Sequence, residues 1–315
     1  MAKSDAKGVI LQPGGLTGRP LLFGEVLYDE FQDGTTVLGG APFNVAWHLR
    51  GFGFDPLLIS RVGDDDLGRA LLERMRGQGL DTSGIQRDAG HPTGRVRISM
   101  VDGEPLFSIL PDQAYDHIDS GALPDLEEAA FALLYHGSLA ARQAPSAAAL
   151  DALRDSGLPI FIDINLRPPW WERESVEQLL AGGRWLKLNH HELAEFADVA
   201  SSDSDALLSG AATLCNRYGL QTVVVTRGAA GAVAVTADGT VVGEPHTVTA
   251  LADPVGAGDA FSAVTLLGIL RGWSMETTLR RATEFAAAIC EVRGAVPADM
   301  AFYGRFLESW RNKNL

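Results

Sequence analysis

Residues 253–261 combine small residues and carboxylates at a spacing that can do chemistry, in the order Asp-Pro-Val-Gly-Ala-Gly-Asp-Ala-Phe. Gly256 and Gly258 flank Ala257, so the backbone there carries little bulk and can adopt positive φ. The apolar run that follows predicts that this turn leads directly into a buried helix. Because the N-terminus of a helix has free amides and about half a positive charge, the turn is suited to binding an anion such as a phosphate.

Asp259 falls in the first turn of this expected helix and faces the same space as the anion. Two interpretations are open. As a helix cap, the carboxylate accepts a hydrogen bond from a backbone amide, and aspartate is common at that position. As a general base, it accepts the proton of a hydroxyl group while the amides of Gly256, Ala257 and Gly258 hold a phosphoryl group. The stretch alone does not decide between them.

Two blocks of the sequence resemble signatures of the ribokinase-type carbohydrate kinases, also called the PfkB family. Residues 253–259 are similar to the family pattern Asp-Thr-x-Gly-Ala-Gly-Asp, with Pro254 where threonine is usual. Residues 39–46, which read Gly-Gly-Ala-Pro-Phe-Asn-Val-Ala, resemble the first signature. With the blocks described below, the resemblance spans almost the entire chain. It implies an α/β fold, a ribokinase-like three-layer sandwich with a mostly parallel central sheet and a small β lid.

The activity that this resemblance implies is the ATP-dependent phosphorylation of a sugar hydroxyl. Asp259 is then the base, the amides of Gly256, Ala257 and Gly258 stabilise charge on the transferring group, and Mg²⁺ bridges the ATP phosphates. An aspartate with a pKa near 4 is a weak base. It suffices here because phosphoryl transfer has a loose transition state, in which deprotonation can come late.

Composition excludes several other classes of protein. The chain has 315 residues, of which 46% are hydrophobic and 21% charged, an ordinary globular balance. A formal net charge of -14 argues against a nucleic-acid or anionic-membrane surface, which needs dense Lys and Arg. No stretch approaches the roughly 18 apolar residues of a membrane span, and the start lacks a signal peptide. We expect a cytoplasmic protein whose partners are a sugar and ATP.

The order of the elements predicts one domain with an appended sheet. We expect a flexible tail over residues 1–19 and a single α/β kinase domain over residues 20–315. From residue 131 onward short apolar strands alternate with helices, which is typical of a parallel sheet covered on both faces. Residues 91–111 read as a hairpin, and with residues 32–40 they predict a small β lid over the substrate. Lids of this kind often pair in the family, which suggests a homodimer.

Candidate sugar-binding residues lie at strand ends, at a glycine pair and on the lid. Carboxylate and amide groups suit sugar hydroxyls because they accept or donate hydrogen bonds. The candidates are Asp29, Gly39, Gly40, Asn44, Arg95, Arg97, Asn165 and Arg167. Alternatives remain open: a surface carboxylate at Asp29, a glycine pair that opens a helix without a ligand, and a solvated strand face for either lid arginine.

Candidate nucleotide and metal residues follow later strands. Residues 187–193 resemble the family's Asn-x-x-Glu element, which implies that Asn189 and Glu192 organise Mg²⁺ through water. The remaining nucleotide-side candidates are Lys187, Thr226, Arg227, Gly228 and Gly231, together with Gly256 and Gly258. The resemblance also implies a monovalent cation such as K⁺ near Asp253. Pro254 leaves that site open, since it lacks both a hydroxyl and a backbone donor.

Two apparent metal motifs are interpreted as structural. Residues 64–66 are three aspartates in a row, but acidic residues are usual in the first turn of a helix. His190 and His191 are adjacent, so they point about 100° apart on a helix, and no third zinc ligand lies at a recognised spacing.

Rival enzyme classes lack their motifs. The sequence contains no GxxxxGK[ST] phosphate loop, and Phe261 stands where a dinucleotide-binding turn needs a third glycine. A sugar- or nucleotide-sensing protein on the same fold remains an alternative. Among substrates, residues 23–25, 39–42 and 165–167 look most like those of fructokinases, which favours D-fructose. A 2-keto-3-deoxygluconate kinase is the second choice, ahead of a ribokinase or a nucleoside kinase.

Overall fold

A computed structural model describes residues 15–101, 104–126, 131–199 and 201–312. Its main sheet has nine strands in the order β13-β12-β11-β10-β9-β8-β1-β4-β5. In this order, the strands between β11 and β5 run parallel to one another. Strand β12 is antiparallel to both of its neighbours, β11 and β13. Their bounds are β1 Arg19–Phe23, β4 Leu57–Gly63, β5 Ile85–Asp88, β8 Phe131–His136, β9 Ile160–Asp163, β10 Trp185–Asn189, β11 Thr222–Thr226, β12 Ala232–Thr236 and β13 Gly239–Gly243. The predicted α/β class with a mostly parallel sheet is confirmed.

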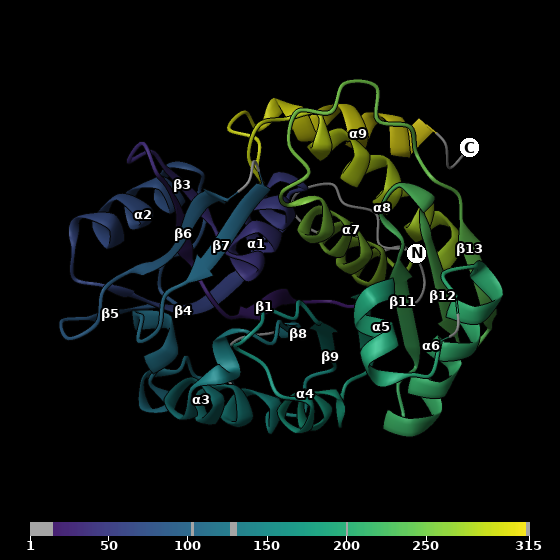
Figure 1. Cartoon of the computed structure of the whole chain (residues 1–315), viewed down its shortest axis with the longest axis horizontal. Helices are drawn as coiled ribbons and strands as arrows, with labels where there is room; N and C mark the ends of the chain where they lie inside the picture. The colour runs from purple at the N-terminus through teal and green to yellow at the C-terminus, as the bar shows by residue number, and fades with distance from the viewer. Residues whose placement is uncertain (1–14, 102–103, 127–130, 200, 313–315) are drawn as a thin grey trace.

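Helices cover both faces of this sheet (Figure 1). Strand β1 shows why, since Leu22 belongs to one core while Leu21 and Phe23 belong to the other, and all three are buried. A parallel strand buried on both sides is apolar throughout. The helices are α1 Ala41–Gly51, α2 Asp66–Gly77, α3 Ala144–Arg154, α4 Arg173–Leu180, α5 His190–Phe196, α6 Ser204–Tyr218, α7 Ala257–Arg271, α8 Met275–Cys290 and α9 Ala301–Asn312.

A second, four-stranded sheet has the order β3-β2-β6-β7. It consists of β2 (Leu27–Phe31), β3 (Thr36–Gly39), β6 (Gly94–Val101) and β7 (Glu104–Ile109). Strands β6 and β7 form the predicted hairpin, whose turn at residues 102–103 lies outside the described residues. Strand β2 joins this sheet too. Asp29, which was expected at a strand end, therefore lies within a strand of the second sheet. The break between β1 and β2 comes at Gly24, where φ is 150°.

The predicted tail falls mostly on residues 1–14, which lie outside the described residues. Within the rest of that segment, Leu16 packs against the core and Arg19 begins β1 and donates a hydrogen bond to Asp81. Among the aspartates of residues 64–66, Asp65 is the cap of α2 and accepts from the amide of Gly68. In the described part of the chain, no helix is both long and apolar enough to cross a membrane.

Candidate active site

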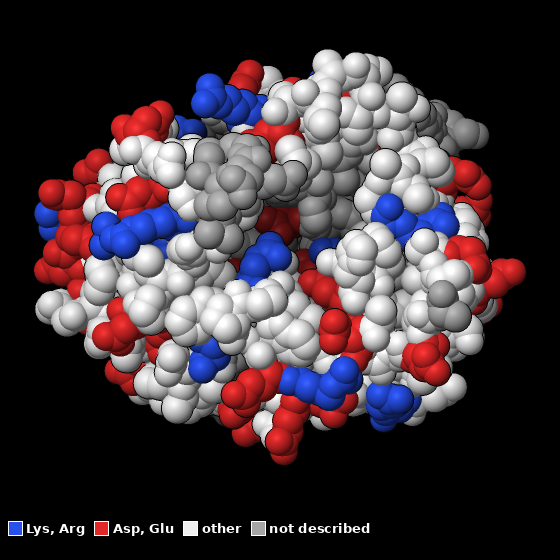
Figure 2. All heavy atoms as spheres, in the orientation of Figure 1, with Lys and Arg blue, Asp and Glu red and all other residues white. Residues whose placement is uncertain are grey.

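A cleft of about 480 Å³ lies between the second sheet and the carboxyl ends of the main-sheet strands. Figure 2 shows the hollow near the centre of one face, with acidic and basic side chains inside it. Most residues predicted for the site line this cleft. They are Asp29, Gly39, Gly40, Asn44, Asn165, Arg167, Lys187, Asn189, Glu192, Thr226, Gly256, Gly258 and Asp259.

Helix α7 begins at the edge of this cleft. Gly256 is its N-cap, with φ at 82°, a conformation that side chains disfavour. A Cβ at Gly256 would approach the Cα of Ala295 to 2.5 Å, so the tight turn also needs glycine for space. The helix that follows is almost entirely buried from Ala260 to Leu270. Its buried body fixes the direction of its free N-terminal amides, and Gly256 and Gly258 place these amides at the cleft.

Asp259 accepts a hydrogen bond from Asn44, and both residues line the cleft. The Nδ2 group of Asn44 donates to Oδ2 of Asp259 over 2.7 Å. Burial raises the pKa of Asp259 to about 6, while the hydrogen bond from Asn44 opposes this rise and Asp163 adds to it. The carboxyl group is therefore ionised at neutral pH and is a stronger base than an exposed aspartate.

Lys187 forms a buried ion pair beside this helix terminus. Its Nζ donates to Oδ1 of Asp163 over 2.9 Å, and both side chains are almost fully buried. Burial alone lowers the pKa of an amine, but the carboxylate of Asp163 outweighs it, so the pKa of Lys187 is raised. A Cβ at Gly258 would lie 3.5 Å from this Nζ. The ammonium group thus adds positive charge at the start of α7.

Asp163 was not among the predicted site residues, and the structure gives it a specific position. Its Oδ2 accepts from the hydroxyl groups of Tyr135, over 3.0 Å, and Ser262, over 2.6 Å. These donors come from β8 and α7 and hold the carboxylate that orients Lys187. The sequence carried no signal for this role, because the four residues are distant in the chain.

Two further carboxyl groups, those of Glu25 and Asp29, line the cleft. Burial raises the pKa of Asp29 to about 6, and the charge of Asp253 adds to the rise. Burial also raises the pKa of Glu25 to about 7, although backbone hydrogen bonds oppose it. Glu25 was missed as a site residue. Its sequence signals were its place after a strand and its position in the fructokinase-like residues 23–25. The structure brings it next to Gly40, where a Cβ would meet the Glu25 carbonyl oxygen at 2.5 Å.

Asn189 and Glu192 form a capping box at the start of α5. The Oδ1 atom of Asn189 accepts from the amides of His191 and Glu192. The carboxylate of Glu192 accepts from the amides of Asn189 and Leu166, one at each oxygen. Burial raises the pKa of Glu192, and the bond from the Asn189 amide opposes the rise. One lone pair on each Glu192 oxygen is left over, so this carboxylate fits a metal held through water. Both lone pairs on Oδ1 of Asn189 are already used by the two amides.

Comparison with known proteins identifies this arrangement. The model for pfkB family carbohydrate kinases matches residues 19–300. The chain belongs to the pfkB family. It is a carbohydrate kinase, that is, a phosphotransferase. The fructokinase of Klebsiella pneumoniae is 32% identical over 269 residues, which cover 81% of this chain and 85% of the relative.

Solved structures of other pfkB kinases share the fold. A fructokinase with bound ATP from Xylella fastidiosa has a TM-score of 0.80 at 22% identity and covers 94% of this chain and 100% of its own. A 2-dehydro-3-deoxygluconokinase from Thermotoga maritima has a TM-score of 0.79 at 18% identity, with coverages of 93% and 100%. A Vibrio cholerae fructokinase, solved with fructose, ADP and potassium ion bound, has a TM-score of 0.75 at 23% identity, with coverages of 93% and 99%.

Arg95 and Arg97, which were predicted to bind the sugar, are not among the residues that line the cleft of this pfkB kinase. In the register between β2 and β6, Val96 pairs with Asp29, and both line the cleft. Successive side chains of a strand point to opposite faces. The two arginines therefore lie on the other face, where each is within 3.9 Å of a carboxylate oxygen of Glu30.

Several nucleotide-side candidates also lie outside the lining residues. Of residues 226–231, only Thr226 lines the cleft. Arg227 donates to the hydroxyl group of Ser204, and Gly228 and Gly231 belong to the turn that follows. Ala257 and Asp253 flank the cleft without lining it. The carboxylate of Asp253 accepts from the amides of Val255 and Gly294, which ties this loop to the end of α8.

Proposed function

We propose that this pfkB kinase transfers the γ-phosphoryl group of ATP to a hydroxyl group of a monosaccharide, with D-fructose as the first candidate. The observation that carries the proposal is the position of Asp259. Its partly buried carboxylate lies in the first turn of α7, accepts from Asn44 and borders a cleft that also contains Arg167 and Lys187. A base and an anion-binding terminus then face the same reacting atoms.

Each side chain has a defined part in this transfer. Asp259 accepts the proton of the attacking hydroxyl, and its pKa of about 6 brings it close to the operating pH. The amides at the start of α7 and the ammonium group of Lys187 stabilise negative charge on the transferring phosphoryl group. Glu192, oriented by the amide of Asn189, would hold Mg²⁺ through water, and the ion, when bound, would neutralise charge on the ATP phosphates.

Unpaired buried oxygens support a polyhydroxyl substrate. Among the described residues, Oε2 of Glu25 and Oδ1 of Asn44 are buried and have no hydrogen-bond partner. Both residues line the cleft, as does Asp29. A buried acceptor without a donor costs free energy, about 1–3 kcal/mol. Sugar hydroxyls supply such donors, and the similarity to a fructokinase at 32% identity favours fructose among the sugars.

A second candidate substrate is 2-keto-3-deoxygluconate. Arg167 lines the cleft, and a guanidinium group can bind a carboxylate through two parallel hydrogen bonds. The structural likeness to the Thermotoga maritima enzyme is compatible with this substrate. The same arginine also serves a phosphate, so the choice is left to the assay.

We propose that K⁺ activates the enzyme but is not required for turnover. Both carboxylate oxygens of Asp253 already accept backbone hydrogen bonds, and Pro254 offers neither a hydroxyl nor an amide. Activity in tetramethylammonium buffer should therefore persist and rise a few-fold with K⁺. Complete loss of turnover without K⁺ would contradict this part.

We also propose that the protein forms a homodimer through the second sheet. Phe31 and Phe107 are 39% and 50% exposed there. Large exposed apolar side chains on one sheet often mark an interface. Sedimentation velocity should give a dimer that Phe31→Asp shifts to monomer; a wild-type monomer would oppose the idea.

The deciding experiment measures ATP-dependent ADP release with fructose, ribose, 2-keto-3-deoxygluconate and adenosine. We expect the highest kcat/KM with fructose and almost no turnover in Asp259→Asn. Turnover of 2-keto-3-deoxygluconate alone would transfer the assignment to the second candidate. If no compound of this panel is phosphorylated, the proposal fails for these substrate classes.

A further inference from the structure

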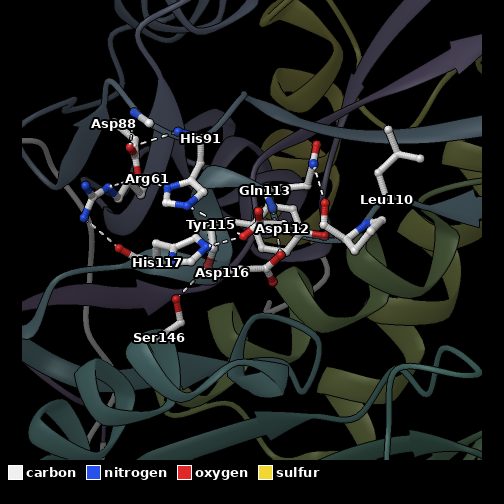
Figure 3. A network of polar contacts seen from close by, with 12 residues as sticks. Arg61, Asp88, His91, Leu110, Asp112, Gln113, Tyr115, Asp116, His117 and Ser146 are labelled. Atoms are coloured by element: carbon white, nitrogen blue, oxygen red, sulfur yellow. Dashed lines mark hydrogen bonds and ion pairs between the residues drawn. The ribbon is translucent and has the colours of Figure 1, made fainter.

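A second group of polar side chains lies at the base of the β6–β7 hairpin and does not line the cleft (Figure 3). His91, Asp112 and His117 each offer one atom that can bind a metal, and these atoms all lie within 4.8 Å of one another. His91 comes before β6, while Asp112 and His117 come after β7. The group therefore joins the segments by which the chain enters and leaves the hairpin.

We infer that His91, Asp112 and His117 bind one divalent transition-metal ion of the zinc class. Imidazole nitrogens and a carboxylate oxygen are typical zinc ligands, and three of them leave a fourth position for water. Bonds of about 2.0 Å in a tetrahedron place ligand atoms about 3.3 Å apart. Oδ1 of Asp112 lies 2.8 Å from Nε2 of His117 and 3.7 Å from Nε2 of His91, which brackets this spacing.

The surroundings of His91 resemble those of a metal-binding histidine. Its Nδ1 lies 2.9 Å from Oδ2 of Asp88, which is buried. Asp88 also contacts Nε of Arg61 over 2.8 Å and accepts from the amide of Gly90, so its position is fixed. A carboxylate that accepts from one ring nitrogen leaves the lone pair of the other nitrogen free for a metal. It is this second nitrogen, Nε2, that faces Asp112.

The charge of the group suits a cation. Arg61 is the basic residue that contacts it, and its guanidinium group is paired with Asp88 and with the backbone carbonyl of His117. Asp112 has no such partner among the basic side chains of the described residues; its contacts are the two histidines. Two imidazoles around a carboxylate that no Lys or Arg side chain of the described residues neutralises form a set of donors that attracts a divalent ion.

The backbone at Asp112 is an independent sign. Among the described residues it is the one non-glycine residue with positive φ, at 56°. Aspartate adopts this conformation more readily than most residues, and non-glycine residues that adopt it cluster at ligand sites. Here it turns the carboxylate toward both histidines (Figure 3).

The two imidazole rings are stacked, with centroids 3.6 Å apart and an angle of 12° between their planes. Coordination of one ion requires the rings to separate from this stack. Both side chains have room to turn, since His91 is 30% exposed and His117 is 26% exposed. The carboxylate of Asp112, at 73% exposed, leaves an open path to solvent.

A bound ion would connect the segment before β6 to the segment after β7 and so restrain the hairpin at its base. Phe107 and Ile109 of β7 line the cleft, as does Val96 of β6. Linking His91 to His117 restrains both ends of this part of the cleft wall. A ligand that binds only the folded chain also raises its stability by mass action.

The test uses the full-length protein, freed of metal by dialysis against a chelator, with Zn²⁺ as the probe. Competition with a chromogenic chelator at pH 7.5 should give one tight site per chain. Asp112→Asn and His117→Ala should each weaken binding at least 100-fold, and Asp88→Asn about 10-fold through His91. Exposed His246 provides a matched control, and His246→Ala should bind like the wild type.

A second readout keeps the test independent of kinase activity. Zn²⁺ should raise the thermal midpoint of the wild type and of His246→Ala, but not that of Asp112→Asn. Asp259→Asn should keep the tight site, which separates it from binding in the cleft. Absence of tight binding in the wild type, or equal binding by Asp112→Asn and the wild type, overturns the inference.

Discussion

Asn44 and Asp259 are 215 positions apart in the chain, and Nδ2 of Asn44 lies 2.7 Å from Oδ2 of Asp259. The contact joins α1 to α7, and each of these helices starts at a glycine with positive φ. One hydrogen bond thus aligns the two signatures that the sequence presents separately. Because the amide donates to the ionised carboxylate, it also sets how readily that carboxylate takes up a proton.

Asp259→Asn tests the base directly. We expect kcat to fall by about 10²–10⁴, the usual contribution of a general base, with little loss of stability because asparagine has the same shape. In the wild type, kcat/KM should fall tenfold per pH unit below about 6, where the carboxyl becomes protonated. A coupled assay of ADP release from pH 5 to 8 checks both. A variant with wild-type kcat would remove Asp259 from the mechanism.

Asn44→Leu removes the hydrogen bond and keeps the volume. The donor lowers the pKa of Asp259, so its loss should raise that pKa. A hydrogen bond to a charged group contributes about 1.5–3 kcal/mol, which corresponds to a shift of about one to two pH units in the acid limb of the kcat/KM profile. If kcat drops while the acid limb stays in place, Asn44 contacts the sugar without tuning Asp259.

Lys187→Met tests the buried ion pair. The change leaves the carboxylate of Asp163 buried without its partner, and we expect the free energy of unfolding to fall by about 3–5 kcal/mol in urea titrations. Ser262→Ala is the matched control, since it removes a neutral donor from the same carboxylate and should cost about 1.5–3 kcal/mol, less than the loss of the ammonium group.

The double variant Lys187→Met, Asp163→Asn separates stability from catalysis. Removing both charges should restore much of the lost stability, because no buried charge is left uncompensated. The kinase should stay impaired, since the ammonium group beside Gly258 is gone. Recovery of full activity in this double variant would show that Lys187 acts only on stability.

Local sequence patterns sufficed for the parallel sheet and for the turn at Gly256, because periodicity and glycine act over a few residues. Glu25 and Asp163 were not predicted as site residues, since their burial depends on segments far away in the chain. Arg95 and Arg97 were predicted to bind the sugar, but they do not line the cleft. A strand pattern does not say which face meets the cleft, and a shift of one residue exchanges the faces.

His48 provides a prediction for the pH dependence of stability. It is fully buried in α1, with Nδ1 2.9 Å from the hydroxyl oxygen of Tyr303, and burial lowers its pKa to about 3. In the unfolded chain the pKa is about 6.5, so below that value the unfolded state binds the proton. The folded state then loses about 1.4 kcal/mol of stability per pH unit as the pH falls from 6.5 toward 3.

The partly buried carboxyls of Asp29 and Asp259 act in the opposite direction. Their raised pKa values mean that the folded state holds the protons between about pH 4 and 6, so they add stability as the pH falls. His48→Asn isolates the histidine. We expect it to be less stable than the wild type at pH 7.5, with the difference shrinking by about 2 kcal/mol at pH 5, measured by urea unfolding. If the stability difference between the two proteins stays constant across this range, His48 is not the group that titrates. Proton uptake by its ring in the unfolded chain is the reason for the expected change in that difference.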